Sequence, residues 1–204
     1  MLGRAPAYFP LFESTLDRFG LPLELKYLPV VESGLNPLAK SRAGARGLWQ
    51  FMYATAKYHG LRIDSYIDER HDPVRSSEAA CTYLAKLYGI YDDWYLALAA
   101  YNAGPGNVNR AIRRSGGKRN FWEIRFFLPR ETRNYVPTFM AVVYLMEFSQ
   151  EHNIYPDQVS PSFAFLDTVM VDEVLRFDQI APLLDLEERR LAQLNPMYRM
   201  DIIP

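Results

Sequence analysis

The chain has 204 residues, a formal net charge of −1, 49% hydrophobic residues and 14% aromatic residues. This length allows one medium domain with at most a small appendage, and the composition is that of a globular protein rather than a disordered one. The near-neutral charge gives no argument for nucleic acid as a partner. The single cysteine, Cys81, excludes an intrachain disulfide and lies in an apolar helical run, where we expect it to be buried.

Targeting and membrane signals are not evident in the sequence. No secretory signal peptide follows Met1, and no apolar run reaches the length needed to cross a membrane. Because the chain stops abruptly at Pro204, we expect it to be an excised piece of a longer protein. An export signal or a membrane anchor would then lie outside these residues.

Apolar periodicity and capping residues predict a series of helices over the first 155 residues. Asp72-Pro73 is a strong helix start, because Asp caps the first turn and Pro is tolerated in it. Pro29 should bend its helix or end its hydrogen bonding, and Gly104-Pro105-Gly106 should form a turn. The expected helices cover residues 8–19, 23–32, 47–59, 73–88, 94–101, 107–114 and 132–152. Without strand-like alternation before residue 160, the sequence predicts a mainly α fold.

The pattern changes at a proline-containing linker, residues 156–162. Beyond it, residues 168–172 read as a strand, residues 177–184 and 187–194 as short helices, and residues 202–203 as the start of a second strand that is cut short. The expected organisation is a first domain over residues 1–155 and a small β-α-α-β module over residues 163–204.

Glu32 is the candidate catalytic residue, because it is a carboxylate at the end of an apolar helix. The preceding residues, Leu28-Pro29-Val30-Val31, offer it no partner charge, and Ser33-Gly34 ends the helix. Loss of water favours the protonated carboxyl and raises its pKa, so that it could donate a proton near neutral pH. The alternative is an ordinary surface glutamate in the last turn of a helix.

Three further motifs follow Glu32-Ser33 in a fixed order. They are Gly47-Leu48-Trp49-Gln50, Ala100-Tyr101-Asn102-Ala103-Gly104 and a late tyrosine, Tyr135. Together the four motifs resemble the soluble lytic transglycosylase family over roughly residues 7 to 150. The resemblance implies a lysozyme-like helical transglycosylase domain that needs neither a cofactor nor a metal. It also implies that the C-terminal module is LysM-like, although a packing appendage is the interpretation we favour over glycan binding.

The resemblance implies an activity and a location. Members cleave the β-1,4 bond between N-acetylmuramic acid and N-acetylglucosamine in peptidoglycan glycan strands and form 1,6-anhydro-N-acetylmuramic acid. They act in the bacterial cell envelope, in the periplasm or anchored at the outer membrane, and we expect a monomer. The alternatives are a goose-type lysozyme-like hydrolase and a non-catalytic peptidoglycan-binding module.

The resemblance also assigns roles to individual residues. Glu32 would be the single acid and base, and Ser41 would bond near the substrate acetamido group or to Glu32. Ser33 could either hydrogen-bond at the helix terminus or contact substrate. The other expected substrate-binding residues are Gln50, Met52, Tyr101, Asn102 and Tyr135. Trp49 and Tyr53 depart from the usual Met and Pro of the family, so that Trp49 adds a ring either to the cleft wall or to the core.

Most glycoside hydrolases need a second carboxylate, and the sequence offers no good candidate. Asp72, Asp92 and Asp93 stand at helix starts, where acids are expected for capping and for the helix dipole. Asp64 and Asp68 look like parts of a solvated loop. A missing second carboxylate is compatible with the single-acid reaction that the resemblance implies.

Between Pro105 and Tyr135 the chain carries eight basic residues against Glu123 and Glu131. A solvated face is the favoured interpretation of this run. The alternative is a rim that attracts the acidic stem peptides of a cell-wall polymer.

Overall fold

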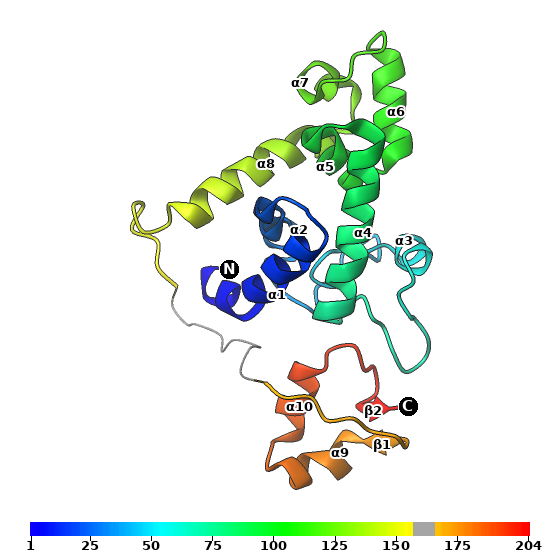
Figure 1. Ribbon diagram of the computed structural model, residues 1–204, viewed down its shortest axis with the longest axis vertical. Coiled ribbons are helices and arrows are strands. Elements are labelled where there is room, and N and C mark those ends of the chain that lie inside the picture. Colours follow the sequence, from blue (N-terminus) through cyan, green and yellow to red (C-terminus); the bar gives the residue numbers. More distant parts are fainter. Residues whose placement is uncertain (157–165) are drawn as a thin grey trace.

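The computed structural model describes residues 1–156 and 166–204, which form a helical body followed by a small module (Figure 1). Residues 157–162 of the expected linker lie outside the described residues. The prediction of a mainly α fold is confirmed, since the described strands are two short ones in the C-terminal module. Within the described ranges, none of the helices combines the length and the apolar character needed to span a membrane.

The N-terminal part of the body contains one long helix, α1, and several short elements around the Glu32 segment. These are η1 (Leu2–Arg4), α1 (Ala5–Arg18), η2 (Leu23–Tyr27), α2 (Leu28–Ser33) and α3 (Tyr53–Tyr58), where η denotes a 3₁₀ helix. The helix expected over residues 23–32 is therefore divided. Its α-helical part begins at Leu28, and Pro29 lies in the first turn, where a missing N–H costs no helix bond.

The prediction of a helix that begins at Gly47 is wrong, because residues 47–50 form a turn and α3 begins only at Tyr53. Gly47 has φ +82° and Gln50 has φ +48°. These left-handed conformations do not occur inside a right-handed helix. The turn thus places Gln50 and Met52 on a loop rather than on a helix face.

Further helices form the rest of the body. They are α4 (Pro73–Tyr91), α5 (Trp94–Ala103), α6 (Pro105–Arg114), α7 (Phe121–Ile124), η3 (Arg125–Phe127) and α8 (Arg130–Glu147). Asp72 caps α4 as predicted, since its Oδ1 accepts from the N–H groups of Val74 and Arg75 at 2.8 and 2.9 Å.

Three boundaries among these helices differ from the expected ones. Helix α4 continues through Gly89 and ends only where Asp92 turns left-handed. Pro105 opens α6 rather than a turn, because proline suits the first helical position, and Gly104 alone separates α5 from α6. Helix α8 ends at Glu147, before His152, while α7 was not predicted.

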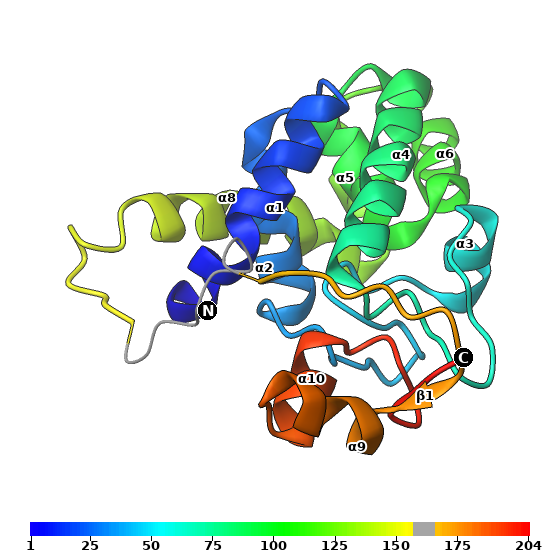
Figure 2. The ribbon, with the colours of Figure 1, turned by 60° about the horizontal axis from the view of Figure 1, so that its bottom comes forward.

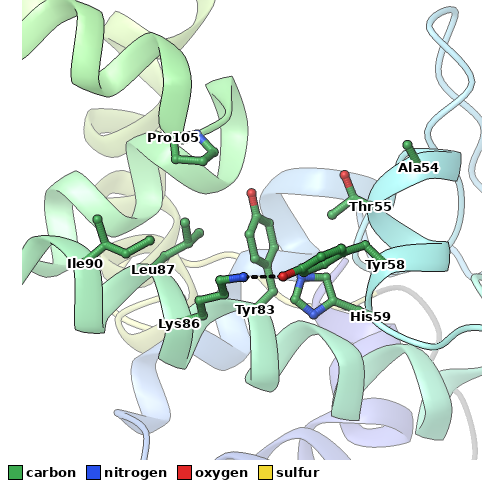
Figure 3. A pocket seen from close by; sticks show the side chains of 9 residues that line it. All are labelled: Ala54, Thr55, Tyr58, His59, Tyr83, Lys86, Leu87, Ile90 and Pro105. Carbon is green, nitrogen blue, oxygen red and sulfur yellow. Dashed lines mark hydrogen bonds between the residues drawn. The ribbon is translucent and has the colours of Figure 1, made fainter.

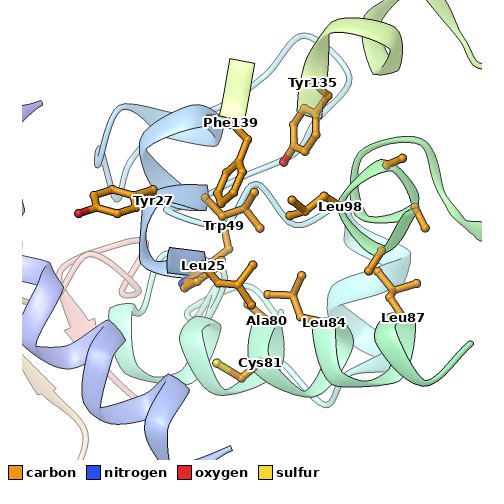
Figure 4. Close-up of a cluster of buried hydrophobic side chains, with 14 of the residues drawn as sticks. Leu25, Tyr27, Trp49, Ala80, Cys81, Leu84, Leu87, Leu98, Tyr135 and Phe139 are labelled. Atoms are coloured by element: carbon orange, nitrogen blue, oxygen red, sulfur yellow. The ribbon is translucent and has the colours of Figure 1, made fainter. Parts of the chain in front are cut away.

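Helix α5 is at the centre of the core, and residues 96–100 are all buried. It packs on α4, α6 and α8. Figure 4 shows Trp49 beside Leu25 and Leu98 in this cluster. Trp49 is completely buried and its Nε1 donates to Ser77 Oγ at 2.9 Å, so its ring belongs to the core and not to a cleft wall. Cys81 is buried as predicted, and its burial raises the pKa of the thiol to about 12.

The C-terminal module has its own small core. It consists of β1 (Leu175–Arg176), α9 (Phe177–Ile180), η5 (Ala181–Leu184), α10 (Glu188–Leu194) and β2 (Ile202–Ile203). The two strands pair antiparallel, with Leu175 opposite Ile203. The β-α-α-β order is confirmed, but the first strand is not at residues 168–172. That stretch is mostly exposed, and β2 pairs instead with the residues directly before α9.

The module lies against the loop that precedes α4 (Figure 2). Ile67 and Tyr198 form an antiparallel bridge, the Asp68 N–H donates to Met197 O at 2.9 Å, and the Arg199 N–H donates to Tyr66 O at 2.8 Å. The interpretation of Asp68 as part of a solvated loop is therefore wrong. Its exposed fraction is 0%, because this contact covers it.

Candidate active site

Glu32 lies in the last turn of α2, where Gly34 in the left-handed conformation ends the helix. The apolar residues Leu28 to Val30 are buried and fix the helix in the core, which leaves Glu32 half-buried at its end. Helix α8 packs across α2, and the hydroxyl of Tyr135 donates a hydrogen bond to Glu32 Oε1. Two motifs that are 103 residues apart in the chain therefore meet directly.

The surroundings of Glu32 raise the pKa of its carboxyl to about 7. Burial is the main cause, the hydrogen bond from Tyr135 opposes it, and the negative charge of Glu131 adds to it. At neutral pH the carboxyl is thus present in both protonation states. Such a group can give up a proton and then accept one, as general acid–base catalysis requires.

Replacing Tyr135 by phenylalanine should shift the alkaline limb of the pH–rate profile to higher pH. The hydrogen bond lowers the pKa of Glu32, so its removal leaves the burial effect less opposed. We also expect kcat to fall by roughly 10- to 100-fold, the size expected for a hydrogen bond to a charged group. The measurement is kcat/KM between pH 5 and 9.

Tyr101→Phe is the matched control for this shift. The Tyr101 hydroxyl donates to Trp49 O at 2.8 Å and not to Glu32. Loss of the Tyr101 hydroxyl should leave the alkaline limb of the pH–rate profile near its wild-type position. An unchanged limb in Tyr135→Phe would contradict the electrostatic role given to Tyr135.

The loop of residues 39–52 lies beside Glu32 and is held by the side chains of its own motifs. Ser33 Oγ is 2.9 Å from both Pro29 O and Leu48 O, so its hydroxyl connects the end of α2 to this loop. Gln50 Nε2 donates to Gly47 O at 2.9 Å and to Ala39 O at 3.3 Å. Of the two roles left open for Ser33, this geometry favours the helix-terminus hydrogen bond.

Ser41 and Met52 occupy the two ends of the loop. Ser41 Oγ accepts from the Ala45 N–H at 3.0 Å, so the hydrogen bond described for its side chain goes to the loop and not to Glu32. Met52 is 45% exposed, as expected of a residue available to a ligand. Neither residue contacts Glu32 through a hydrogen bond of the described chain.

Tyr101 and Asn102 attach helix α5 to both sides of the site. The bond from Tyr101 to Trp49 O joins α5 to the loop. Asn102 Oδ1 accepts from Thr132 Oγ1 at 2.8 Å, which joins α5 to the first turn of α8. Burial and the charge of Glu32 raise the pKa of Tyr101 well above its ordinary value, so its hydroxyl stays protonated and acts as a donor.

The sequence placed Glu131 only within the basic run and did not predict its position near Glu32. Glu131 is exposed on α8, and its charge contributes to the raised pKa of Glu32. The signal was available, because Glu131 precedes Tyr135 by four residues and positions four apart share a helix face. Asp64, by contrast, accepts from the N–H groups of Tyr66 and Ile67 in its own turn.

A pocket of about 320 Å³ lies between α3, α4 and the start of α6 (Figure 3). Two of its lining residues are joined by a hydrogen bond, since Lys86 Nζ donates to the Tyr58 hydroxyl at 2.6 Å. The Tyr83 ring lines the pocket, with its centroid 4.8 Å from that of His59 and 5.4 Å from that of Tyr101. The pocket therefore adjoins the Tyr101 side of the site through the tilted contact of the Tyr83 and Tyr101 rings.

A second pocket, of about 250 Å³, lies between α6 and the start of α8. Three arginines of the basic run, Arg110, Arg114 and Arg133, line it together with Phe126 and Phe127. Part of the basic run therefore lines a concave surface. Outside it, Arg125 is half-buried and its Nε donates to Arg133 O at 2.7 Å.

Known proteins match both parts of the chain. Residues 11–124 match the Transglycosylase SLT domain family, and residues 165–204 match the family "Lytic transglycosylase MltD, LysM-like domain". The chain is 32% identical to membrane-bound lytic murein transglycosylase D of Escherichia coli K12 over 94% of its own length, but it spans only 43% of that relative. It is 36% identical to peptidoglycan transglycosylase gp16 of Escherichia phage T7, over 66% of this chain and 10% of that protein.

A solved structure shares the fold of the helical body. The 70 kDa soluble lytic transglycosylase of Escherichia coli superposes with a TM-score of 0.61 and 28% identity, over 71% of this chain and 24% of that one. The lysozyme-like helical fold and the resemblance seen in the four motifs are thus confirmed. Because the first family match covers more than half of the 204 residues, this chain belongs to the transglycosylase SLT domain family.

Proposed function

We propose that this chain is the catalytic part of a peptidoglycan lytic transglycosylase. It would cleave the β-1,4 bond between N-acetylmuramic acid and N-acetylglucosamine in glycan strands. The proposal rests on the environment of Glu32. Its pKa is raised to about 7, and its carboxyl accepts a hydrogen bond from the Tyr135 hydroxyl. The names of two relatives, a murein and a peptidoglycan transglycosylase, support the choice of substrate.

Glu32 can perform both halves of the reaction. Its protonated carboxyl donates to the glycosidic oxygen while the C1–O4 bond breaks, and the substrate's own 2-acetamido group stabilises the positive anomeric carbon. The resulting carboxylate then removes the proton of the C6 hydroxyl, whose oxygen attacks C1 to give the 1,6-anhydro sugar. No water is consumed, and Tyr135 stabilises the carboxylate between the two steps.

The remaining site residues would bind the sugar. The exposed Met52 thioether and the Ser41 hydroxyl, at the two ends of the loop, would contact the saccharide. Gln50, Tyr101 and Asn102 would contact it with the atoms that their hydrogen bonds leave available. Ser33 would support the loop.

The two pockets suit the rest of a peptidoglycan strand. Aromatic faces pack on the apolar faces of sugars, and the pocket lined by Tyr58 and Tyr83 offers two of them. The arginines of the second pocket would attract the acidic stem peptides of the polymer.

We assign residues 1–155 to the catalytic domain, 156–162 to a linker and 163–204 to the LysM-like module. The separate hydrophobic clusters of the two parts support this division. The protein would act as a monomer in the bacterial cell envelope. The name of the membrane-bound relative supports this location.

Product analysis tests the proposed reaction. Digestion of sacculi in H₂¹⁸O should release muropeptides that end in 1,6-anhydro-N-acetylmuramic acid without ¹⁸O, because the C6 hydroxyl replaces water as the nucleophile. Mass spectrometry distinguishes this product from a reducing end. Reducing N-acetylmuramic acid carrying ¹⁸O would instead indicate a hydrolase of the goose-type lysozyme kind. The search for its second base should then begin with Glu131, because Asp68 is enclosed by Arg70 and Arg199.

A further inference from the structure

A buried carboxylate joins the two parts of the chain. Asp68 Oδ1 and Oδ2 accept from Arg70 Nε and Nη2, both at 2.8 Å, and Oδ2 also accepts from Arg199 Nη2 of the C-terminal module at 2.9 Å. Arg46 Nε and His71 Nε2 are each 3.9 Å from Oδ2. Burial alone would raise the pKa of Asp68, but the arginines hold it well below its usual range. The carboxylate is therefore fully charged and depends on these partners.

Arg70 transmits this arrangement to the loop of residues 39–52. Its Nη1 donates to Gly44 O at 3.2 Å, near the middle of the loop, and to Phe51 O at 3.4 Å, near its C-terminal end. Its own carbonyl oxygen lies so close to Gly47 that an added Cβ would be 1.7 Å away. His71 Nδ1 is 2.7 Å from Pro37 O, just before the loop. Residues 68–71 thus form the support on which the loop rests.

The module holds Arg199 in place from two sides. Tyr198 bridges Ile67, and its ring packs edge-on against Phe177 in the core of the module, with centroids 5.7 Å apart. The Arg199 N–H is bonded to Tyr66 O at 2.8 Å. The backbone of residues 198 and 199 is therefore fixed at two points, and from there the Arg199 side chain, 36% exposed, reaches the fully buried carboxylate of Asp68.

We propose that Arg199 is a positioning residue, through which the C-terminal module fixes the substrate-side loop by way of Asp68 and Arg70. The loop supplies Leu48 O to Ser33, beside Glu32, and Trp49 O to Tyr101. Without Arg199, Oδ2 loses a donor and water gains access to the Asp68–Arg70 pair. The loop then moves relative to Glu32, and small displacements of this kind reduce rates strongly.

Arg199→Ala tests the proposal with two independent readouts. Amide exchange over residues 39–52 should speed up while α5 keeps its protection. On soluble peptidoglycan strands, kcat/KM should fall by roughly 10- to 100-fold, with the alkaline limb unmoved because the Glu32–Tyr135 pair lies on α2 and α8. Added guanidinium ion should restore part of the rate by occupying the vacated place. Arg189→Ala, an exposed arginine on α10 of the same module, is the matched control and should behave as wild type.

Two outcomes would overturn the proposal. One is wild-type exchange and activity in Arg199→Ala, and the other is faster exchange spread evenly over the body without guanidinium rescue, which would indicate general destabilisation. If Arg199→Ala does not fold, Arg199→Lys keeps the charge with a single donor group and should show the same selective loop exchange in weaker form. The rate readout rests on the proposed function. The exchange readout does not rest on it. A chain that is inactive on peptidoglycan would refute the proposed function, while amide exchange would still test whether Arg199 positions the loop.

Discussion

Glu32→Gln is expected to reduce glycan cleavage below detection while the protein stays folded and still binds glycan. The amide has nearly the shape of the carboxyl and can still accept from Tyr135, but it cannot deliver a proton. General acid–base catalysis contributes roughly 10²–10⁴-fold, and here one residue performs both halves of the reaction. The measurement is the release of soluble muropeptides from sacculi.

The same variant should gain stability relative to wild type as the pH rises. The pKa of Glu32 is raised from 4.5 to about 7 in the folded chain. Its contribution to stability is therefore complete below pH 4.5 and is lost as the pH rises through 7, where a charged carboxylate must be kept half-buried. Glutamine stays neutral throughout. The Tm difference between variant and wild type should thus be more positive at pH 8 than at pH 5.

Glu123→Gln is a suitable control for both measurements. Glu123 is exposed on α7 and pairs with Lys118 at 2.8 Å. Its replacement should leave activity and the pH dependence of Tm close to wild type. Activity within a few-fold of wild type in Glu32→Gln would remove Glu32 from the mechanism, and a Tm lower than wild type at pH 8 would make it a structural residue instead.

Local sequence features predicted the elements that depend on local physics. Asp72-Pro73 marked the start of α4, and the apolar approach to Glu32 indicated the raised pKa that the structure gives it. The pairing of Glu32 with Tyr135 followed from the order of the family motifs, since no local pattern links residues 103 positions apart.

The errors arose where distant contacts override local patterns. The charged neighbours Glu69 and Arg70 predicted that Asp68 is solvated, yet Arg199, 131 residues later, helps to bury it. The stretch of residues 168–172 has the composition of a strand, but β2 pairs with Leu175–Arg176 instead. Residues 47–50 look helical because sequence periodicity carries no information about the close approach of Arg70 to Gly47.

Gly47→Ala should have the largest effect on stability of any single methyl group added to the loop. Gly47 has φ +82°, a conformation that L side chains rarely adopt. Its added Cβ would be 1.7 Å from Arg70 O and 2.7 Å from Arg70 C, which are backbone atoms that no rotamer change can move. Either the loop or the segment of residues 68–71 must be displaced. We expect a loss of roughly 4 kcal/mol or more in the free energy of unfolding, a large part of the stability of an ordinary domain.

Gly44→Ala separates the clash from the backbone strain. Gly44 has φ +90°, but nothing lies within 4 Å of its added Cβ, so it should show only the strain of the left-handed conformation, about 1–2 kcal/mol. Urea unfolding of the two variants measures the difference. Equal losses would show that Arg70 does not press on the loop at Gly47. If residues 68–71 set the position of Gln50 and Met52 relative to Glu32, Gly47→Ala should lose much more unfolding free energy than Gly44→Ala. The fraction of Gly47→Ala that stays folded should also lose cleavage activity.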